Sequence, residues 1–460
     1  MKFKQLLLLI VFTVLLKTTT AQNFSIVDTL PDGAYGAAAW GDYNNDGLKD
    51  LVYMAQGVPA NYCLVYTNTG SSFTPVAQYF PYLYNPAVKW VDLNNDGFDD
   101  LVMNGADSSF IFRTFIYQSN GNGTFTSIPN SITGLFSGSI AAADYNNDGW
   151  IDLAVTGNDT VNGHAAYIYK NSGNFNFTDI NATLTGTHFG ELQWGDYDND
   201  SLPDLVINGI GNSDFRVRIY KNMGNDIFQL QPFYMKGSGG TVDWADMDND
   251  GWLDILVTGY DSTSVQSFTE LHRNNGNSTF TIVPTNMPEC GEPSGVAIAD
   301  FNNDNLLDVA FIGGVNLPAF TTSYLGINTG NNWFQSYPMV NGYILMSITE
   351  TADYDNDGDM DLLFGRLILR NDGPLTVPGI QEPVTVTLYP NPVHEKLKIT
   401  AAQPLTALTL LNSTGAVVNS FKAIKNTMEI DISNLAPGIY FLRYQTAQGQ
   451  TGLKKMVISN

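Results

Sequence analysis

Short apolar runs recur along the chain at a near-constant interval. Seven of them follow one kind of polar segment and read DLVYM, DLVMN, DLAVT, DLVIN, DILVT, DVAFI and DLLFG. Apolar residues occupy both faces of these runs, which is typical of β-strands buried on both sides. The pattern therefore predicts one buried central strand in each of seven repeats.

The polar segment before each run is a nine-residue loop rich in Asp and Asn, which we call an acidic loop. The first residues of the seven acidic loops are 50 to 54 residues apart: Asp42, Asp92, Asp144, Asp196, Asp246, Asp300 and Asp353. A fixed period of this length in a strand-rich sequence is typical of propeller blades, each of about four strands. We therefore predict a seven-bladed β-propeller over residues 22–373.

A second signature stands some 25 residues after each acidic loop. It is an Asn-x-Gly turn followed by Phe, as from Asn68 to Phe73, and it predicts the hairpin between the third and fourth strands of a blade. Ser119 replaces the Asn in the second repeat, and the seventh copy stops after Asn-Asp-Gly at 371–373. The strand missing there resembles the segment 23–28, so we predict that this segment completes the last blade and closes the ring.

The last 78 residues, 383–460, have more basic than acidic side chains. Short alternating runs (VTVTLYPNP, KLKIT, LTALTLL, MEIDIS and IYFLRY) are separated by turn residues. This pattern predicts a small Ig-like β-sandwich. Pro and Gly residues mark a linker at 374–382. The predicted fold class is therefore all-β, with a propeller followed by a sandwich.

The first 21 residues are typical of a secretory signal peptide. Lys2 and Lys4 precede an apolar stretch over 6–16, and the small residues Thr19 and Ala21 precede a cleavage point after Ala21. Eleven apolar residues are too few to cross a bilayer, which takes about 20. We therefore expect export of a mature chain without a transmembrane segment, into surroundings where calcium is abundant.

The acidic loops carry the clearest chemistry. Asp or Asn stands at positions 1, 3, 5 and 9 of every copy, and the carbonyl at position 7 can join them around one point. An all-oxygen donor set suits Ca²⁺ and does not suit zinc or copper. An EF-hand is excluded because position 12 is apolar in every copy. We expect up to seven Ca²⁺ ions. The predicted ligands, loop by loop, are Asp42, Asn44, Asp46, Leu48 and Asp50; Asp92, Asn94, Asp96, Phe98 and Asp100; Asp144, Asn146, Asp148, Trp150 and Asp152; Asp196, Asp198, Asp200, Leu202 and Asp204; Asp246, Asp248, Asp250, Trp252 and Asp254; Asp300, Asn302, Asp304, Leu306 and Asp308; Asp353, Asp355, Asp357, Asp359 and Asp361.

The seven loops are not equivalent. Three of them have four Asp ligands and the other four have three Asp and one Asn, and more carboxylates usually tighten Ca²⁺ binding. Gly at position 6 permits the positive φ that the curl needs, but Ser201 and Asn305 replace it in two loops. Asn tolerates that conformation better than Ser does. We predict that the Asp196 loop is the weakest or most distorted site.

The formal net charge of −24 follows from these loops, because 24 of the 45 acidic side chains are predicted ligands at positions 1, 3, 5 and 9. Acidity argues against nucleic acid or an anionic membrane as partner. Hydrophobic residues make up 43% of the chain, which excludes disorder. Cys63 and Cys290 are too few for a disulfide scaffold; two free thiols are the favoured interpretation, and pairing in an oxidising compartment stays open.

Four Trp residues stand two positions before an acidic loop: Trp40, Trp90, Trp194 and Trp244. They could form a ladder that stacks on sugars. Their fixed phase in the repeat favours packing between neighbouring blades, because buried aromatic side chains dominate core energetics.

The motifs resemble two known families. The DxDxDGxxD loops are similar to the calcium sites of FG-GAP/VCBS repeats, related to the head of integrin α chains. The strings YPNP at 389–392, NSTGAV at 412–417, LAPGIY at 435–440 and the lysines at 454–455 resemble the type A sorting domain of the Bacteroidetes type IX secretion system. The second resemblance implies contact between residues 383–460 and the secretion machinery. It also implies export across the outer membrane, followed by release or surface anchoring.

No catalytic motif stands out. His164, His188, His272 and His394 occur at different phases, and a carboxylate pair drawn from Glu191, Glu270, Glu289, Glu292 and Glu350 has no preferred members. Arg216 and Arg218 are candidates for a lyase base only because basic residues are scarce. The favoured function is a secreted or surface-bound adhesion or binding module, monomeric, with an unknown protein or polysaccharide ligand. The alternative is a polysaccharide lyase or hydrolase with its site on one face of the propeller.

Overall fold

The computed structural model describes residues 22–460 except 58–60, 213, 238, 262–265, 315–320, 331, 340–347, 375–385, 390–392, 395, 402–404, 413–416, 425–426, 436, 447–450 and 459–460. The predicted signal peptide and nearly all of the predicted linker lie outside the described residues. The chain divides into two compact units, Met1–Pro374 and Leu375–Asn460. Among the described residues, no helix has both the length and the apolar character needed to cross a membrane.

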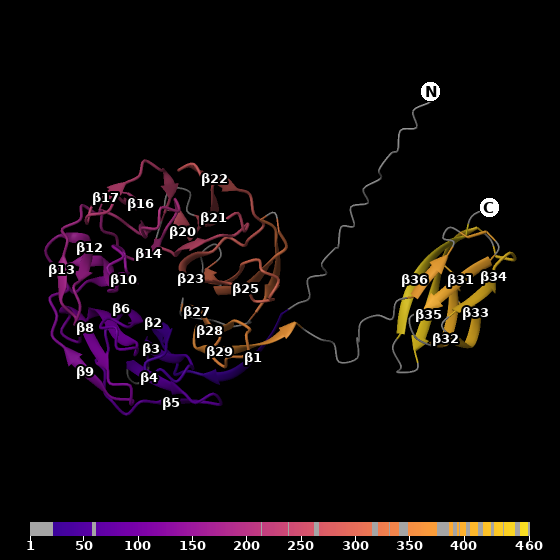
Figure 1. The fold of residues 1–460 in the computed structure, drawn as a ribbon, viewed down its shortest axis with the longest axis horizontal. Helices are drawn as coiled ribbons and strands as arrows, with labels where there is room; N and C mark the ends of the chain where they lie inside the picture. The colour runs from indigo at the N-terminus through magenta and orange to yellow at the C-terminus, as the bar shows by residue number, and fades with distance from the viewer. Residues whose placement is uncertain are drawn as a thin grey trace, which may run out of the picture. The chain divides into compact units, whose positions relative to one another are not determined.

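The described part of the first unit forms seven antiparallel sheets arranged around an axis (Figure 1). We call them blades 1 to 7 in chain order. The strands of each blade contact those of the next, and the innermost strand of blade 7 contacts that of blade 1. The strands are β2 (Ala34–Gly41), β3 (Asp50–Gln56), β4 (Tyr62–Asn68) and β5 (Phe73–Pro75); β6 (Tyr84–Val91), β7 (Asp100–Ala106), β8 (Phe112–Ser119) and β9 (Phe125–Ile128); β10 (Phe136–Ala143), β11 (Asp152–Asp159), β12 (Gly163–Asn171) and β13 (Phe177–Asp179); β14 (Leu192–Gly195), β15 (Asp204–Ile207), β16 (Arg216–Asn222), β17 (Phe228–Leu230) and β18 (Met235–Lys236); β19 (Val242–Ala245), β20 (Asp254–Asp261), β21 (Gln266–Asn274) and β22 (Phe280–Val283); β23 (Gly291–Ala299), β24 (Asp308–Gly314), β25 (Thr321–Asn328) and β26 (Phe334–Pro338); β27 (Thr349–Ala352), β28 (Asp361–Phe364) and β29 (Leu367–Pro374).

The predicted closure of the ring is confirmed. Strand β1 (Gln22–Thr29) pairs antiparallel with β29 and is the outermost strand of blade 7. The ring of Phe24 lies 6.0 Å from that of Phe301 in an edge-on contact. The first described segment of the chain and the last blade therefore share one sheet, and neither leaves an open edge at that position.

The four Trp side chains pack between blades, as predicted. Each stacks on a Tyr that stands at position 2 of the acidic loop in the preceding blade. The rings of Trp244 and Tyr197, for example, are 6.0 Å apart and 6° from parallel. These stacked pairs contribute about 0.5–1.5 kcal/mol each beyond the burial of their area. Their role is to hold adjacent blades together, and a sugar-stacking ladder is not formed.

The strand order gives the propeller two distinct faces. Within a blade the strands are antiparallel, so the turns between strands one and two and between strands three and four share one face. All seven acidic loops and the Asn-x-Gly turns lie there, and we call it the loop face. The turns between strands two and three, and the links from one blade to the next, lie on the opposite face.

The second unit is the predicted sandwich. One sheet holds β30 (Val386–Tyr389), β31 (Lys396–Ala401) and β34 (Thr427–Asp431). The other holds β33 (Val417–Ile424), β32 (Leu405–Asn412), β35 (Gly438–Thr446) and β36 (Thr451–Ile458). A core of buried aliphatic residues from both sheets, including Leu397, Leu408 and Leu442, joins them. Strands β33 and β36 were not among the predicted runs.

The two cysteines are free thiols. Cys63 lies on β4 and Cys290 lies directly before β23, in different blades, and burial raises the pKa of both thiols to about 12. The favoured interpretation of two unpaired, structural cysteines is confirmed.

Candidate functional site

The first Asp of each acidic loop organises the local backbone. In the Asp144 loop, the N–H of Asp148 donates to Asp144 Oδ1 at 3.0 Å and the N–H of Gly149 donates to Oδ2 at 2.8 Å. The corresponding pair of bonds is present in all seven loops. Because backbone donors saturate one edge of this carboxylate, the loop curls around it.

Position 4 is Asn in every loop, and sequence reasoning gave it no role. All seven of these Asn residues have a left-handed backbone, with φ between 54° and 59°. In most loops the side chain also reaches the next blade: Asn147 Nδ2 donates to Ser201 O at 2.9 Å, and Asn356 Nδ2 donates to Gly47 O at 2.7 Å across the ring closure. Asn suits this position because its short polar side chain tolerates the left-handed region. The available signal was its presence in all seven copies.

The closing Asp at position 9 is buried in every loop, with at most 1% of it exposed. Its Oδ1 accepts a hydrogen bond from the backbone N–H of the residue that ends the third strand. In blade 3, Asn171 N–H donates to Asp152 Oδ1 at 2.7 Å. In six loops its Oδ2 accepts a second hydrogen bond, from the backbone N–H of position 2. In blade 3, Tyr145 N–H donates to Asp152 Oδ2 at 3.3 Å. Burial raises the pKa of all seven closing carboxyls to about 7, against these backbone bonds, which lower it.

The Asn of the Asn-x-Gly turn is the second residue that sequence reasoning undervalued. In blade 5, Asn274 Nδ2 donates to Leu253 O at 3.1 Å and to Tyr197 O of the preceding blade at 2.7 Å. The same two bonds recur in blades 1, 3, 4, 6 and 7. In blade 2, Ser119 Oγ makes only the second of them, to Tyr43 O at 2.7 Å. This buried amide therefore ties each loop to its own blade and to its neighbour.

Three acidic loops gather carboxylates closely enough to share one cation. Within each group, one oxygen from every member lies within 4.8 Å of the others; the groups are Asp196, Asp198 and Asp204; Asp246, Asp248 and Asp250; Asp353, Asp355 and Asp357. Among the described residues, Oδ1 of the position-3 Asp is buried without a hydrogen-bond partner in all three loops. Burial and neighbouring carboxylates raise the pKa of Asp248 and Asp355. An orphaned, buried carboxylate oxygen beside other carboxylates fits a hard divalent cation.

The four loops with Asn at position 3 have one carboxylate fewer. Asn44, Asn94, Asn146 and Asn302 each use Oδ1 to accept the N–H of position 5, at 2.9 to 3.0 Å. Among the residues that the structure describes, no three acidic side chains in these loops come within the distance found in the other three. The difference that the sequence predicts between four-Asp and three-Asp loops is therefore visible in the geometry.

A basic side chain accompanies each of the three four-Asp loops. It stands directly before the Asn of the Asn-x-Gly turn: Lys221 contacts Asp198 and lies 3.1 Å from Asp200, and Arg273 lies 3.4 Å from Asp248. Arg370 occupies the same place in blade 7. Burial raises the pKa of Asp355, and the charge of Arg370 lowers it by a smaller amount. Lys170, beside the Asp148 carboxylate at 3.9 Å, is the fourth such residue. Thr67, Gln118 and Ile327 stand there in blades 1, 2 and 6.

The Asp196 loop keeps the common frame despite its Ser. Ser201 adopts φ of 71° and its N–H donates to Asp196 Oδ2 at 2.7 Å; Asn305 adopts φ of 66° in the equivalent place. The loop is therefore not distorted in its backbone bonds, and its relative affinity stays a prediction.

Most residues considered for catalysis are held by other side chains. Arg218 is 7% exposed and contacts Asp214, which also lies 2.5 Å from Arg216 Nε. His272 is buried, with Nε2 3.2 Å from Glu270 Oε2. Glu289 is exposed, and the side chain of Glu292 lies outside the described residues.

Glu191 and Glu350 are the two remaining Glu candidates, on different blades. Gln193 Nε2 donates one hydrogen bond to Glu191 Oε1 at 3.2 Å and another to Asp243 Oδ1 at 2.8 Å. Burial raises the pKa of Glu191 and Asp243, and it raises the pKa of Glu350 to about 7. These carboxyls influence one another and Lys89, but sequence reasoning did not pair them.

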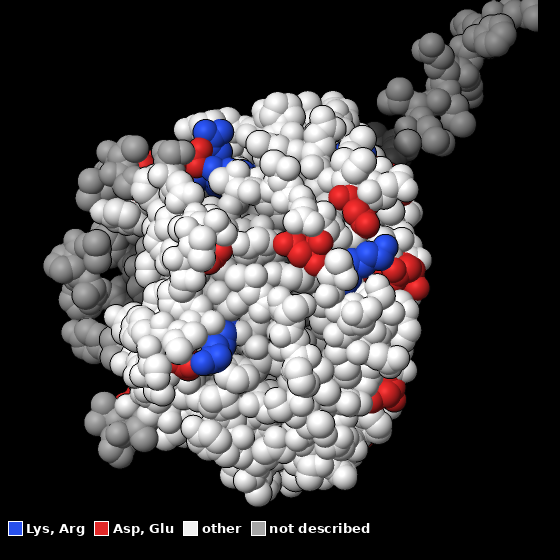
Figure 2. All heavy atoms as spheres, turned by 90° about the vertical axis from the view of Figure 1, so that its left-hand side faces the viewer, with Lys and Arg blue, Asp and Glu red and all other residues white. Residues whose placement is uncertain are grey.

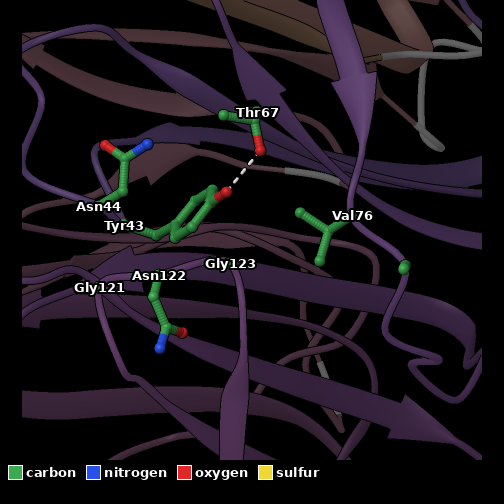
Figure 3. Close-up of a pocket in the computed structure, with 8 residues that line it drawn as sticks. Tyr43, Asn44, Thr67, Val76, Gly121, Asn122 and Gly123 are labelled. Atoms are coloured by element: carbon green, nitrogen blue, oxygen red, sulfur yellow. Dashed lines mark hydrogen bonds between the residues drawn. The ribbon is translucent and has the colours of Figure 1, made fainter.

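A shallow cleft of about 400 Å³ lies on the loop face between blades 1 and 2 (Figure 3). Its lining includes Tyr43, Thr67 and the turn Gly121-Asn122-Gly123. The hydroxyls of Tyr43 and Thr67 are 2.5 Å apart and bond to each other (Figure 3). Because Tyr43 is the only ionisable residue of the lining, this cleft offers no acid–base pair.

Comparison with known families identifies both units. A secretion system C-terminal sorting domain matches residues 387–459. The FG-GAP-like repeat matches five overlapping segments, 42–103, 92–155, 144–207, 196–257 and 246–311. No curated protein matches the chain in sequence.

Among solved structures, the chain is similar to PorZ, an essential bacterial surface component of the type-IX secretion system of Porphyromonas gingivalis. The identity is 10% and the TM-score 0.33, over 89% of this chain and 64% of PorZ, so the chain covers less than two thirds of PorZ. AofleA from Arthrobotrys oligospora matches at 10% identity and TM-score 0.40, over 71% of this chain and 91% of AofleA. The exotype rhamnogalacturonan lyase YesX matches at 12% identity and TM-score 0.41, over 96% of this chain and 75% of YesX.

At such identities and scores these similarities carry no argument about ligand or activity. The repeat matches are different, because they span residues 42–311, more than half of the chain, and the sorting domain follows them. The chain therefore belongs to the FG-GAP-like repeat family and, through its C-terminal sorting domain, is exported by type IX secretion to the cell surface or the extracellular space.

Proposed function

We propose that the protein is an exported binding or adhesion module whose propeller is held rigid by Ca²⁺ in its acidic loops. The observation that carries the proposal is the repeated loop frame, with an unpartnered, buried Asp oxygen at position 3 of the three four-Asp loops. An all-oxygen site of this kind favours Ca²⁺ over transition metals.

The residues that would hold Ca²⁺ are the side chains at positions 1, 3 and 5, with the closing Asp, in each loop. Bound Ca²⁺ would supply positive charge among carboxylates that otherwise repel one another. The chain's own contribution is a frame in which backbone donors already orient the first and closing Asp. Because the loops of adjacent blades are bonded to each other, a cation in one loop would also stiffen its neighbour.

Binding is favoured over catalysis because the ionisable groups considered for chemistry have structural partners. Arg218 and His272 are buried and paired. Glu191 and Asp243 share the amide of Gln193. The sorting domain and the repeats account for export, and the ligand would then be an extracellular protein or polysaccharide.

Calcium binding is tested by equilibrium dialysis with ⁴⁵Ca²⁺ and by thermal unfolding of the exported protein with and without EGTA. We expect several ions per chain and a clear fall in Tm on chelation, since one site at 100-fold saturation adds about 2.7 kcal/mol. An unchanged Tm in EGTA together with no bound ⁴⁵Ca²⁺ at millimolar concentration would refute the calcium part.

Binding and catalysis are separated by incubating the protein with soluble polysaccharides and following both retention and reducing-end release. Retention without turnover supports a binding module. Turnover that Glu350→Gln abolishes would replace the proposal by a polysaccharide-degrading enzyme.

A further inference from the structure

The opposite face of the propeller differs from blade to blade, and its first unusual feature is backbone strain. Seven residues before the first Asp of the loop, blades 1 to 4 have a non-glycine residue with a left-handed backbone: Tyr35 at φ 46°, Asn85 at 41°, Ser137 at 55° and Phe189 at 50°. In blades 1 to 3 this coincides with a shift in strand register. A bulge of this kind re-aims the side chains beside it and costs of order 1 kcal/mol or more per strained residue.

The side chains next to these bulges form a continuous row of aromatic rings, which we call the aromatic ridge: Tyr82, Tyr84, Phe110, Phe136 and Phe112. Successive ring centroids are 5.2, 5.5, 5.8 and 5.3 Å apart. The ridge crosses from blade 2 to blade 3. Phe110, at its centre, is 61% exposed and itself has a positive φ of 59°.

The ridge continues toward blade 4 through polar groups. The N–H of Phe189, whose ring is 50% exposed, donates to Ser137 O at 2.8 Å. The ring of His188 stacks on that of His164, with centroids 4.2 Å apart. Nδ1 of His164 lies 2.6 Å from Asn158 Oδ1. Nδ1 of His188 lies 3.1 Å from Ile210 O. Because both Nδ1 atoms face oxygen acceptors, each neutral ring keeps Nε2 as an acceptor.

Charged side chains bordering this surface have partners within it, one an ion pair and one a carboxylate held by neutral donors. Arg113 Nε lies 2.6 Å from Asp107 Oδ2, and Asp159 Oδ2 accepts from Tyr167 Oη at 2.8 Å and from Asn162 Nδ2 at 2.7 Å. Figure 2, which views the outer side of the propeller where blades 2 and 3 lie, shows few charged groups; the basic ones lie beside acidic ones, and further acidic groups stand alone. The basic group Arg113 is therefore already paired with a carboxylate, which disfavours an anionic ligand.

Flat rings, neutral acceptors and a basic group that is already paired together favour one class of ligand. The C–H faces of a pyranose ring carry partial positive charge and are attracted to the negative face of an aromatic ring, while its hydroxyls need neutral hydrogen-bond partners. Apolar protein segments would match the rings but would leave the neighbouring His and Asn groups unpaired. Rigid rings also lose little conformational entropy on binding.

We propose that the aromatic ridge on the opposite face, with the His164–His188 pair beside it, binds an uncharged polysaccharide across blades 2 to 4. The inference rests on the proposed binding function and names its site and ligand class. Sugar rings stack along the ridge with Phe110 as the central contact, and hydroxyls donate to the histidine Nε2 atoms.

The test is affinity gel electrophoresis of the full exported chain through soluble barley β-glucan, starch, galactomannan and xylan, with polygalacturonate as the anionic comparison. We expect retardation by at least one neutral polysaccharide and none by polygalacturonate. Phe110→Gly removes the ring while suiting the left-handed backbone, so it should weaken binding about tenfold, the upper range for one aromatic contact, without lowering Tm. Trp333→Ala removes a ring that is 60% exposed in a loop-face turn and should leave binding unchanged.

The outcomes separate the two proposals. If a neutral polysaccharide binds and Phe110→Gly binds equally well, the binding function stands and the ridge is refuted as its site. If binding is to polygalacturonate alone, the neutral ligand is refuted. If no polysaccharide binds, but a phenyl matrix retains the protein and Phe110→Gly abolishes that retention, the ridge belongs to an apolar protein partner and the glycan is refuted. If neither binds, both the ridge and the polysaccharide form of the proposed function fail.

Discussion

The two faces of the propeller are built by different means. On the loop face the same hydrogen bonds recur: backbone N–H groups donate to the first Asp of every loop, and the turn Asn of six blades donates to the preceding blade, with Ser119 in its place in blade 2. On the opposite face, strained residues and aromatic rings occur in blades 1 to 4 and differ between them. Repetition favours stability, because each blade receives the same support, whereas variation allows one region to recognise a ligand. Substitutions on the loop face should therefore change stability, and those on the opposite face should change binding.

Both faces belong to a closed ring of blades, and opening this ring should have the largest effect on stability. Deleting residues 23–30 removes most of β1, its pairing with β29 and the Phe24–Phe301 contact. We expect Tm to fall by more than about 10 °C, because an open sheet edge and an incomplete core replace a sealed blade. The point variant Ile26→Ser, at a side chain 60% exposed, is the control and should change Tm little. An unchanged melting curve for the deletion would show that closure does not support the loop face.

The second prediction removes the repeated pair of turn-Asn hydrogen bonds from one blade of the loop face. Asn274→Ala deletes the donors to Leu253 O and Tyr197 O without touching a predicted ligand. Leaving buried carbonyls unsatisfied costs about 1–3 kcal/mol each, so we expect a loss of about 2–4 kcal/mol in urea denaturation at saturating calcium. Asn274→Ser should lose less, since Ser119 retains the inter-blade bond in blade 2. Asn275→Ala, at the exposed neighbour, should be nearly neutral, and an equal loss there would contradict the proposed role.

The third prediction concerns pH and the interior acids between the two faces. Burial raises the pKa of Glu350 from 4.5 to about 7. The nearby charge of Lys89 lowers this pKa, and that of Glu191 raises it further. The folded state then holds this proton more tightly than the unfolded state. Its contribution is fully present below pH 4.5 and is lost as the pH rises through 7. Glu350→Gln should therefore stabilise the protein by about 1–2 kcal/mol at pH 8 and by much less at pH 5.

Chemical denaturation at both pH values, with calcium constant, measures this difference. Glu289→Gln replaces an exposed acid and serves as the matched control. A gain at pH 8 that is no larger than at pH 5 would contradict the buried state of Glu350.

The smallest expected effect is on the metal affinity of a single acidic loop. Arg273 lies 3.4 Å from Asp248 and 4.0 Å from Asp250, so it competes with a cation for the same carboxylates. Arg273→Met should tighten metal binding at this loop by up to about fivefold, as expected for an exposed charge pair of up to about 1 kcal/mol. The part of the Trp-sensitised terbium luminescence that is lost in a Trp252→Phe variant reports on this loop. Arg366→Met, beside Asp32 and away from the acidic loops, should leave the titration unchanged.

Much of the loop face could be predicted because its information is local and repeated. Positions 1, 3, 5 and 9, the hairpin after the third strand and the missing outer strand of blade 7 are all visible in one repeat or in the comparison of repeats. The roles of Asn147 at position 4 and of Asn171 in its turn were not predicted, although their spacing was available. Their partners lie in neighbouring blades, and a single repeat does not reveal them.

The sequence by itself determined the all-β class, the period of the blades, the sandwich and the oxygen chemistry of the loops. Short-range patterns decide these properties, since alternation, turn residues and ligand spacing act within tens of residues. Only the tertiary structure decided which Asp residues within a loop come together, which basic residue faces each of these loops, and that Phe110 meets Phe136 at the boundary of two blades. These contacts depend on how separate strands pack around one axis, and the physical reason is that such packing joins residues with no local relation in the chain.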